Sequence, residues 1–165
     1  MVWWIILIEV VVFVGIFTAL VMLPTIKHPE LGVHNYPKEI QDEYFKTHKK
    51  IETSPLSART ILIKSFGILL FTALLIGGAI IAGAKTFWDG ALFATILFGV
   101  VGAWDTFFID WVLFANLKCF RLPGTEHMDK EYHQKWFHVK GMLFPGLLFL
   151  LILASLTGLG VILFV

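Results

Sequence analysis

The sequence predicts an all-α integral membrane protein with four transmembrane helices, and two observations predict this class. Hydrophobic residues make up 58% of the 165 residues and charged residues only 15%, whereas soluble domains carry about 25% charged residues. Long apolar stretches occupy residues 2–23, 61–84, 91–117 and 141–165. Each meets or exceeds the roughly 20 residues that a bilayer-spanning helix needs. We therefore expect a single transmembrane domain with two long loops, at 24–60 and 118–140.

The first apolar stretch is interpreted as a retained span rather than a cleaved signal. Met1 is followed directly by Val2 and Trp3, whereas a signal peptide begins with a positive segment and ends at a small-residue cleavage site. Pro24 and Pro29 follow the stretch. Because proline cannot donate the backbone hydrogen bond that continues a helix, both prolines are expected to end this one.

The lysines and arginines predict the orientation. All but one of the 13 belong to the two long loops or the span ends beside them, and the exception is Lys85. The positive-inside rule then places both loops in the cytoplasm and both termini outside. Trp3, Trp4 and Trp88 fall at the outer span ends, where an aromatic belt is expected. The default location is the inner (plasma) membrane of a bacterium.

The turn between spans two and three is short, at 85–90, and predicts an antiparallel helical hairpin. Small residues that allow close helix packing recur through span two and, more weakly, in span four up to Gly160. They are Ala73, Gly77, Gly78, Ala79, Ala82, Gly83 and Ala84 in span two, and Ala154 and Gly158 in span four. These faces serve either packing within the chain or association with a second copy or a partner membrane subunit.

The first loop carries the pattern of an amphipathic helix at 37–51. Ile40, Tyr44, His48 and Ile51 recur at helical spacing, and lysines and carboxylates occupy the remaining surface. Such a helix lies in the headgroup layer and binds membrane lipids, or it is a connector packed on the protein. The sequence leaves both interpretations open.

Two aspartates in the third span are the costliest residues of the chain. A central intramembrane aspartate costs about 2.5 to 3.5 kcal/mol on insertion scales, so Asp105 and Asp110 should face a partner, water or the protein interior. On an α-helix, residues five apart are separated by about 140°, so no tight carboxylate pair is expected. Lys64 and Arg59 are the expected structural partners of Asp110. Glu9 raises the same question in the first span.

The second loop is predicted to form a short helix that begins near Thr125. His127, Glu131, Gln134 and His138 would share one stripe of it. The two histidines would lie about 16 Å apart along the axis, so they cannot hold one ion together. His127 and Glu131 alone are the candidates for a divalent metal site.

Three functions follow from these residues. The first is an interfacial enzyme or binding site for a lipidic or membrane-delivered substrate at the cytoplasmic face. Its catalytic candidates are Asp110, His127 and Glu131, and its substrate-binding candidates are Arg121, Asn116 and Asp105. The second is a small transport or accessory protein that uses Asp105 and Asp110 for proton or cation passage. The third is a structural membrane scaffold.

Composition also argues against some classes. A net charge of +1 gives no basic excess with which to bind nucleic acid. The single cysteine, Cys119, excludes an internal disulfide and a metal site made of cysteines alone.

Overall fold

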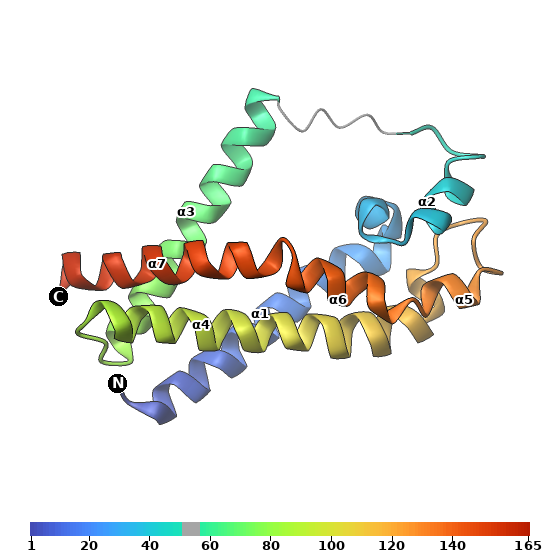
Figure 1. The fold of residues 1–165 in the computed structure, drawn as a ribbon. Coiled ribbons are helices and arrows are strands. Elements are labelled where there is room, and N and C mark those ends of the chain that lie inside the picture. Colours follow the sequence, from blue (N-terminus) through green and yellow to red (C-terminus); the bar gives the residue numbers. More distant parts are fainter. Residues whose placement is uncertain (51–56) are drawn as a thin grey trace. The chain divides into compact units, whose positions relative to one another are not determined.

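The computed structural model describes residues 1–50 and 57–165, without the side chain of Arg59. Regular structure in these ranges is helical throughout, with no β-strand (Figure 1). The helices are α1 (Trp3–Lys27), η1 (Pro29–Asn35), α2 (Lys38–Tyr44), α3 (Ala58–Ile81), α4 (Phe87–Trp104), the π-helix η2 (Asp105–Phe114), η3 (Lys118–Phe120), α5 (Asp129–Tyr132), α6 (Lys135–Leu143) and α7 (Gly146–Phe164).

Four helical segments are long and apolar enough to cross a membrane, which confirms the all-α class and the number of candidate spans. They are Trp3–Lys27, Thr60–Ile81, Phe87–Phe114 and Asp129–Phe164. By their internal contacts the residues form two compact units. The first comprises Met1–Phe13, Glu52–Val100 and Leu147–Val165, and the second comprises Val14–Ile51 and Val101–Gly146.

In the first unit, the start of α1, the helix α3, most of α4 and the helix α7 pack together. The backbone N–H of Val2 donates to the carbonyl of Ala82 at 2.7 Å, so the amino end meets the turn after α3. The rings of Phe13 and Phe71 pack edge to face at a centroid distance of 6.2 Å. Glu9 lies against Gly78 in α3, and its Oε2 atom is buried without a hydrogen-bond partner among the described residues.

Small residues mediate these helix contacts. A Cβ atom on Gly158 would lie 2.7 Å from the carbonyl oxygen of Phe87, and one on Gly78 would lie 2.9 Å from the Phe93 ring. Gly160 faces Ile76 at still shorter range. Gly78 in span two and Gly158 and Gly160 in span four are thus used for packing within the chain. Association with a second copy or a partner subunit stays a prediction.

The first helix continues past the point where it was expected to end. It runs through Pro24 to Lys27 and stops at His28, whose φ of −141° leaves helical geometry just before Pro29. The expectation that Pro24 ends the helix was wrong. A proline removes one backbone hydrogen bond but has a φ compatible with a helix, and apolar helices of this kind tolerate it.

The fourth apolar stretch is divided rather than continuous. Phe144 has φ −145° and ψ 114°, an extended conformation that separates α6 from α7. The residue before a proline avoids helical dihedrals, because the proline ring clashes with its backbone. Pro145 therefore accounts for the division, which the expectation of one helix over 141–165 missed.

The helix expected from Thr125 to His138 is likewise divided. Only α5 and the start of α6 are helical there, and they are separated at His133 and Gln134. Thr125 does not cap a helix, since its hydroxyl donates to the carbonyl of Leu122 at 2.9 Å. Tyr132 of α5 is buried, and its hydroxyl accepts a hydrogen bond from the backbone N–H of Leu122 in this turn. Tertiary contacts of Thr125 and Tyr132 thus override the helical pattern.

In the first loop, only residues 38–44 of the expected amphipathic helix are helical. Ile40 is fully buried in a small core with Val33, Tyr36, Leu122 and Tyr132. The start of the apolar stripe therefore packs on the protein. After Tyr44 the chain continues as turns, and Nδ1 of His48 lies 3.1 Å from the Tyr44 carbonyl oxygen. Ile51, the last member of the stripe, lies outside the described residues.

Candidate functional site

The third long helix changes from α to π geometry at Asp105 and keeps it for 10 residues. The backbone N–H of Ala115 donates to the carbonyl of Asp110, five residues earlier. In a π-helix, residues five apart are therefore neighbours one turn apart, as residues four apart are in an α-helix. Asp105 and Asp110 consequently share one side of η2. The expected separation of the two carboxylates was wrong, because it assumed α-helical periodicity.

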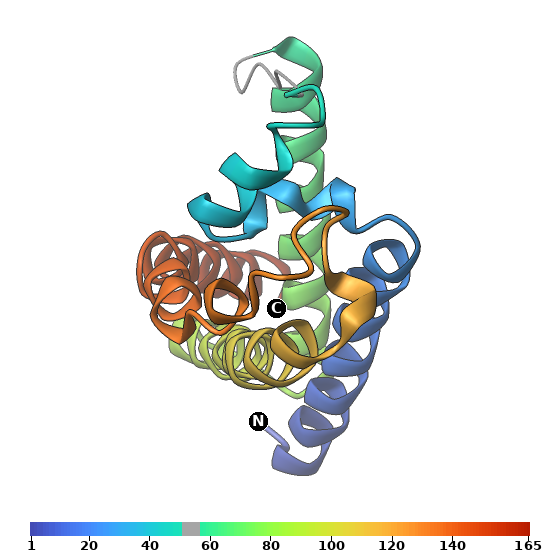
Figure 2. The ribbon, with the colours of Figure 1, turned by 90° about the vertical axis from the view of Figure 1, so that its right-hand side faces the viewer.

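Asp110 is paired with a histidine from α6. Nδ1 of His138 lies 2.8 Å from Oδ2 of Asp110, and the two side chains are only 13% and 18% exposed. The helix α6 packs along η2, as both ribbon views show (Figures 1 and 2). Trp111 strengthens this packing, since its Nε1 donates to the Lys135 carbonyl at 3.3 Å. The Lys135 ammonium also lies 5.1 Å from the centroid of the Trp111 ring.

Asp105 belongs to the same cluster. It lies within electrostatic range of both Asp110 and His138. The neighbouring Thr106 is buried, and Trp104 anchors the start of η2 by donating from Nε1 to the hydroxyl of Thr18 at 3.0 Å. Two carboxylates and one imidazole thus lie within electrostatic range of one another, in two of the helical segments that are apolar enough to span a membrane. We call Asp105, Asp110 and His138 the acid–imidazole cluster.

His138 as the partner of Asp110 was missed from the sequence. The expected partners were Lys64 and Arg59, and the Arg59 side chain lies outside the described part of the chain. His138 stands just before the stretch at which the fourth span was expected to begin, whereas the apolar helical segment extends back to Asp129. A helix start placed earlier would have put His138 at the membrane depth of Asp110.

The loop after η2 is held by Arg121, whose side chain is 7% exposed. Its Nη2 donates to Oδ1 of Asp129 at 2.6 Å and to the carbonyl of Ala115 at 2.9 Å. The guanidinium also lies over the Tyr132 ring, 3.9 Å from its centroid. Its Nη1 is buried and has no acceptor within the described residues. Arg121 therefore joins the end of η2 to α5.

Arg121 and Asn116, two of the expected substrate-binding residues, line one cavity of 380 Å³ together with Lys118, Glu126 and Asp129. The Asn116 amide donates back to the Val112 carbonyl at 2.8 Å. Asp105, the third expected binding residue, belongs to the acid–imidazole cluster instead. The structure therefore distributes these three residues over two places.

His127 and Glu131 do not share a helix face with His138, because the expected helix is divided. His127 is exposed in the turn before α5 and lies near Glu43. The pKa of Glu43 is lowered, chiefly by its hydrogen bond to Lys46 and to a smaller extent by the charge of His127.

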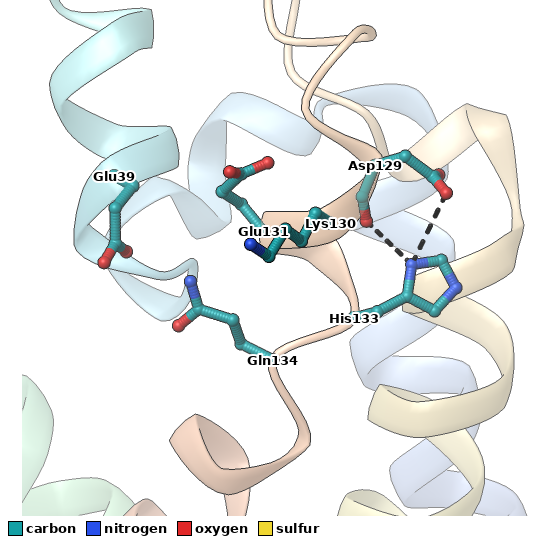
Figure 3. Close-up of a pocket in the computed structure, with 6 residues that line it drawn as sticks. All are labelled: Glu39, Asp129, Lys130, Glu131, His133 and Gln134. Atoms are coloured by element: carbon teal, nitrogen blue, oxygen red, sulfur yellow. Dashed lines mark hydrogen bonds and ion pairs between the residues drawn. The ribbon is translucent and has the colours of Figure 1, made fainter.

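Glu131 lines a second, open cavity of 670 Å³ with Glu39, Asp129, Lys130, His133 and Gln134. Figure 3 shows Glu131, Lys130 and Gln134 on the side facing Glu39, whereas His133 turns to Asp129. Nδ1 of His133 donates to the Asp129 carbonyl at 2.7 Å. Across residues 1–50 and 57–165 no group of three or more His, Cys, Asp or Glu side chains is arranged to hold a metal ion. The pair His127 and Glu131 therefore has no third ligand of these types there.

Two tyrosines fix the second loop against the first. The Tyr36 hydroxyl donates to the Phe120 carbonyl at 2.8 Å. The Tyr132 hydroxyl accepts from the backbone N–H of Leu122 at 2.9 Å and is hydrogen-bonded to Thr125. Burial, with a smaller effect from Tyr132, raises the pKa of Tyr36 above its ordinary value. The Tyr36 phenol therefore remains a hydrogen-bond donor throughout the neutral range.

No family model, curated protein or solved structure matches the chain. The assignment of a function therefore rests on the geometry of these residues.

Proposed function

We propose that the protein is a small membrane transport or accessory protein in which the acid–imidazole cluster binds protons and passes them on. The observation that carries the proposal is the 2.8 Å pairing of Asp110 with His138, which lie in two of the helical segments that are apolar enough to span a bilayer. The proposal includes insertion in the membrane, with both long loops in the cytoplasm and both termini outside, and a bacterial inner membrane as the location.

The chemistry of the cluster fits proton binding. An aspartate and a protonated histidine form a neutral pair, which lowers the cost of holding either charge away from water. Loss of the proton leaves a single negative charge, and a second carboxyl group, Asp105, is close enough to respond to it. Chains of aspartate and histidine side chains inside membrane segments are characteristic of proton relays. In this proposal Asp105 and Asp110 are the carboxyl groups that bind protons. His138 transfers protons between water and Asp110.

The interfacial-enzyme hypothesis has less geometric support. It needs Asp110, His127 and Glu131 around one substrate, yet Glu131 lines the cavity that faces Glu39, and His127 lies near Glu43. The pairing of Asp110 with His138 supports a role that does not depend on these loop residues.

Flux measurements in reconstituted vesicles test the proposal. A pH-sensitive dye in the vesicle lumen reports proton entry under an imposed pH gradient. We expect wild-type protein to accelerate entry over empty vesicles. Asp110→Asn and His138→Gln should each lower the rate at least about tenfold, as loss of a positioned proton-transfer group does. Asp105→Asn should also reduce it.

His127→Ala and Glu131→Gln are the matched controls, since both change ionisable loop residues outside the cluster. They should leave the rate unchanged. Wild-type vesicles that take up protons no faster than empty ones would overturn the proposal. The same conclusion would follow if Asp110→Asn altered thermal stability but not flux, because the pair would then be structural.

A further inference from the structure

We propose that the cavity of 380 Å³ beside Arg121 binds the headgroup of a phospholipid that carries both a phosphate and a primary amine. This inference concerns a different site from the acid–imidazole cluster, and it depends only on the insertion of η2 in a membrane.

The charges around the cavity are balanced. Its wall contains two cations, Lys118 and Arg121, two carboxylates, Glu126 and Asp129, and the amide of Asn116. A site for a simple anion would present an excess of positive charge, and a site for a cation an excess of carboxylates. A wall with both signs and no net charge complements a ligand that itself carries one charge of each sign.

Arg121 supplies the group for the phosphate. Its Nη2 is already used by Asp129 and Ala115, whereas its Nη1 is buried and has no acceptor among the described residues. A guanidinium attracts phosphate oxygens and binds them through charge-assisted hydrogen bonds. At this wall the Arg121 guanidinium attracts a phosphate by its charge, and the exposed Lys118 ammonium can donate hydrogen bonds to it.

Glu126 supplies the group for the amine. Its side chain is exposed at the cavity and forms no ion pair with any described residue. Asp129 instead holds Arg121 with Oδ1. A primary ammonium has three N–H donors to offer to such a carboxylate, as a lysine ammonium does, whereas a quaternary ammonium has none. The cavity should therefore distinguish ethanolamine from choline headgroups.

The position of the cavity favours a lipid over a soluble phosphoamine. Asn116 lies two residues beyond Phe114, the end of the π-helix and of the third candidate span, so the cavity lies at the level of the headgroups when this helix is inserted. Val112 and Leu117, at the same end of that span, are 46% and 41% exposed. These apolar side chains offer a surface on which acyl chains of the bound lipid can lie.

Lipid retention by the delipidated, detergent-purified protein tests this inference. Native mass spectrometry measures the fraction of protein that holds one lipid when phosphatidylethanolamine, phosphatidylcholine or phosphatidylglycerol is added at equal concentration. We expect about tenfold tighter binding of phosphatidylethanolamine than of phosphatidylcholine, the effect of one charge-assisted hydrogen bond.

The substitutions are made at exposed residues, so that folding is preserved. Glu126→Gln should remove the preference for ethanolamine over choline while leaving choline binding unchanged. Lys118→Gln should weaken both lipids equally, since both carry the phosphate. Glu131→Gln, in the cavity that faces Glu39, is the control and should change neither.

Three results would overturn the inference. The first is equal binding of ethanolamine and choline lipids by the wild type. The second is stronger binding of phosphatidylglycerol, which would identify an anion site without a role for Glu126. The third is displacement of the lipid by soluble glycerophosphoethanolamine at equal concentration, which would identify a small soluble ligand in place of a membrane lipid.

Discussion

At the scale of single residues, Tyr36 joins two loops that are distant in sequence. Its hydroxyl donates to the Phe120 carbonyl, 84 residues away, from a side chain that is 3% exposed. Tyr36→Phe leaves this carbonyl buried without its donor, so we expect a loss of about 1 to 3 kcal/mol of stability. Thermal unfolding in detergent, followed by circular dichroism, measures it.

Tyr44→Phe is the matched control for this substitution. The Tyr44 hydroxyl makes no hydrogen bond with the described residues, and its ring is only partly buried. Its removal should therefore shift the unfolding temperature little. Equal shifts for both variants would contradict the role assigned to the Tyr36 hydroxyl.

The raised pKa of Tyr36 predicts a dependence of stability on pH. Below about pH 10, the phenol is protonated in the folded and the unfolded chain, and its contribution to stability is complete. Above that pH the unfolded chain ionises first, because burial raises the folded pKa. Stability should then fall as the pH rises.

Unfolding temperatures measured at pH 9 and pH 11 check this expectation. Between these values Tyr36→Phe should lose less stability than the wild type does, because it lacks the ionising group. An equal decline in the two proteins would show that other groups control the alkaline limit.

The sequence identified Asp110 as a residue that needs a partner, but not which partner. The need follows from composition alone, since an aspartate inside an apolar stretch is costly wherever the helix packs. The partner depends on which segment packs beside η2. His138 belongs to α6, which begins at Lys135. The sequence predicted one helix from Thr125 to His138 and therefore missed this separate helix.

At the scale of elements, a glycine allows the close contact between α4 and α7. A Cβ atom on Gly158 would lie 2.7 Å from a backbone oxygen of Phe87, which cannot move aside as a side chain can. Gly158→Ala should therefore force the helices apart and cost about 1 to 3 kcal/mol. Thermal unfolding in detergent measures the loss.

Gly77 offers the control, because a Cβ atom there meets nothing within 4 Å. Gly77→Ala should be neutral or should stabilise its helix by up to about 1 kcal/mol, since alanine has the higher helix propensity. Destabilisation by Gly77→Ala and tolerance of Gly158→Ala would reverse the expected order. That reversal would place the close helix contact elsewhere.

The π-helix could not be predicted from its sequence. Residues 105–114 contain neither glycine nor proline, and their apolar content fits an α-helix equally well. The difference between the two geometries is the register of backbone hydrogen bonds, which composition does not encode. This register decides whether Asp105 and Asp110 diverge or share one side, so the main feature of the candidate site was inaccessible to spacing arguments.

At the scale of the whole molecule, long apolar stretches and loops differ in how far they can be predicted. Hydrophobicity is a local property, so the number of candidate spans was correctly predicted from composition. The folded loops depend on contacts between distant residues, such as Ile40 with Leu122 and Tyr132. No local pattern encodes those contacts, so the helices of both loops came out shorter than expected.

The orientation of the chain is the prediction that belongs to this scale. All lysines and arginines except Lys85 lie in or beside the two long loops, so translocation of those loops would be strongly disfavoured. Cys119 is exposed and is first replaced by serine. Lys49→Cys, Lys130→Cys and Lys85→Cys are then each added to this background and treated with a membrane-impermeant maleimide.

In bacterial cells whose outer membrane has been removed and whose inner membrane is intact, we expect the reagent to label the Lys85→Cys variant only. In inverted vesicles it should label the Lys49→Cys and Lys130→Cys variants and spare Lys85→Cys. Labelling of the two loop positions from opposite sides would require an odd number of crossings between them. The assignment of α3 and α4 as a membrane hairpin would then fail, and with it the membrane depth on which both the proton relay and the headgroup site depend.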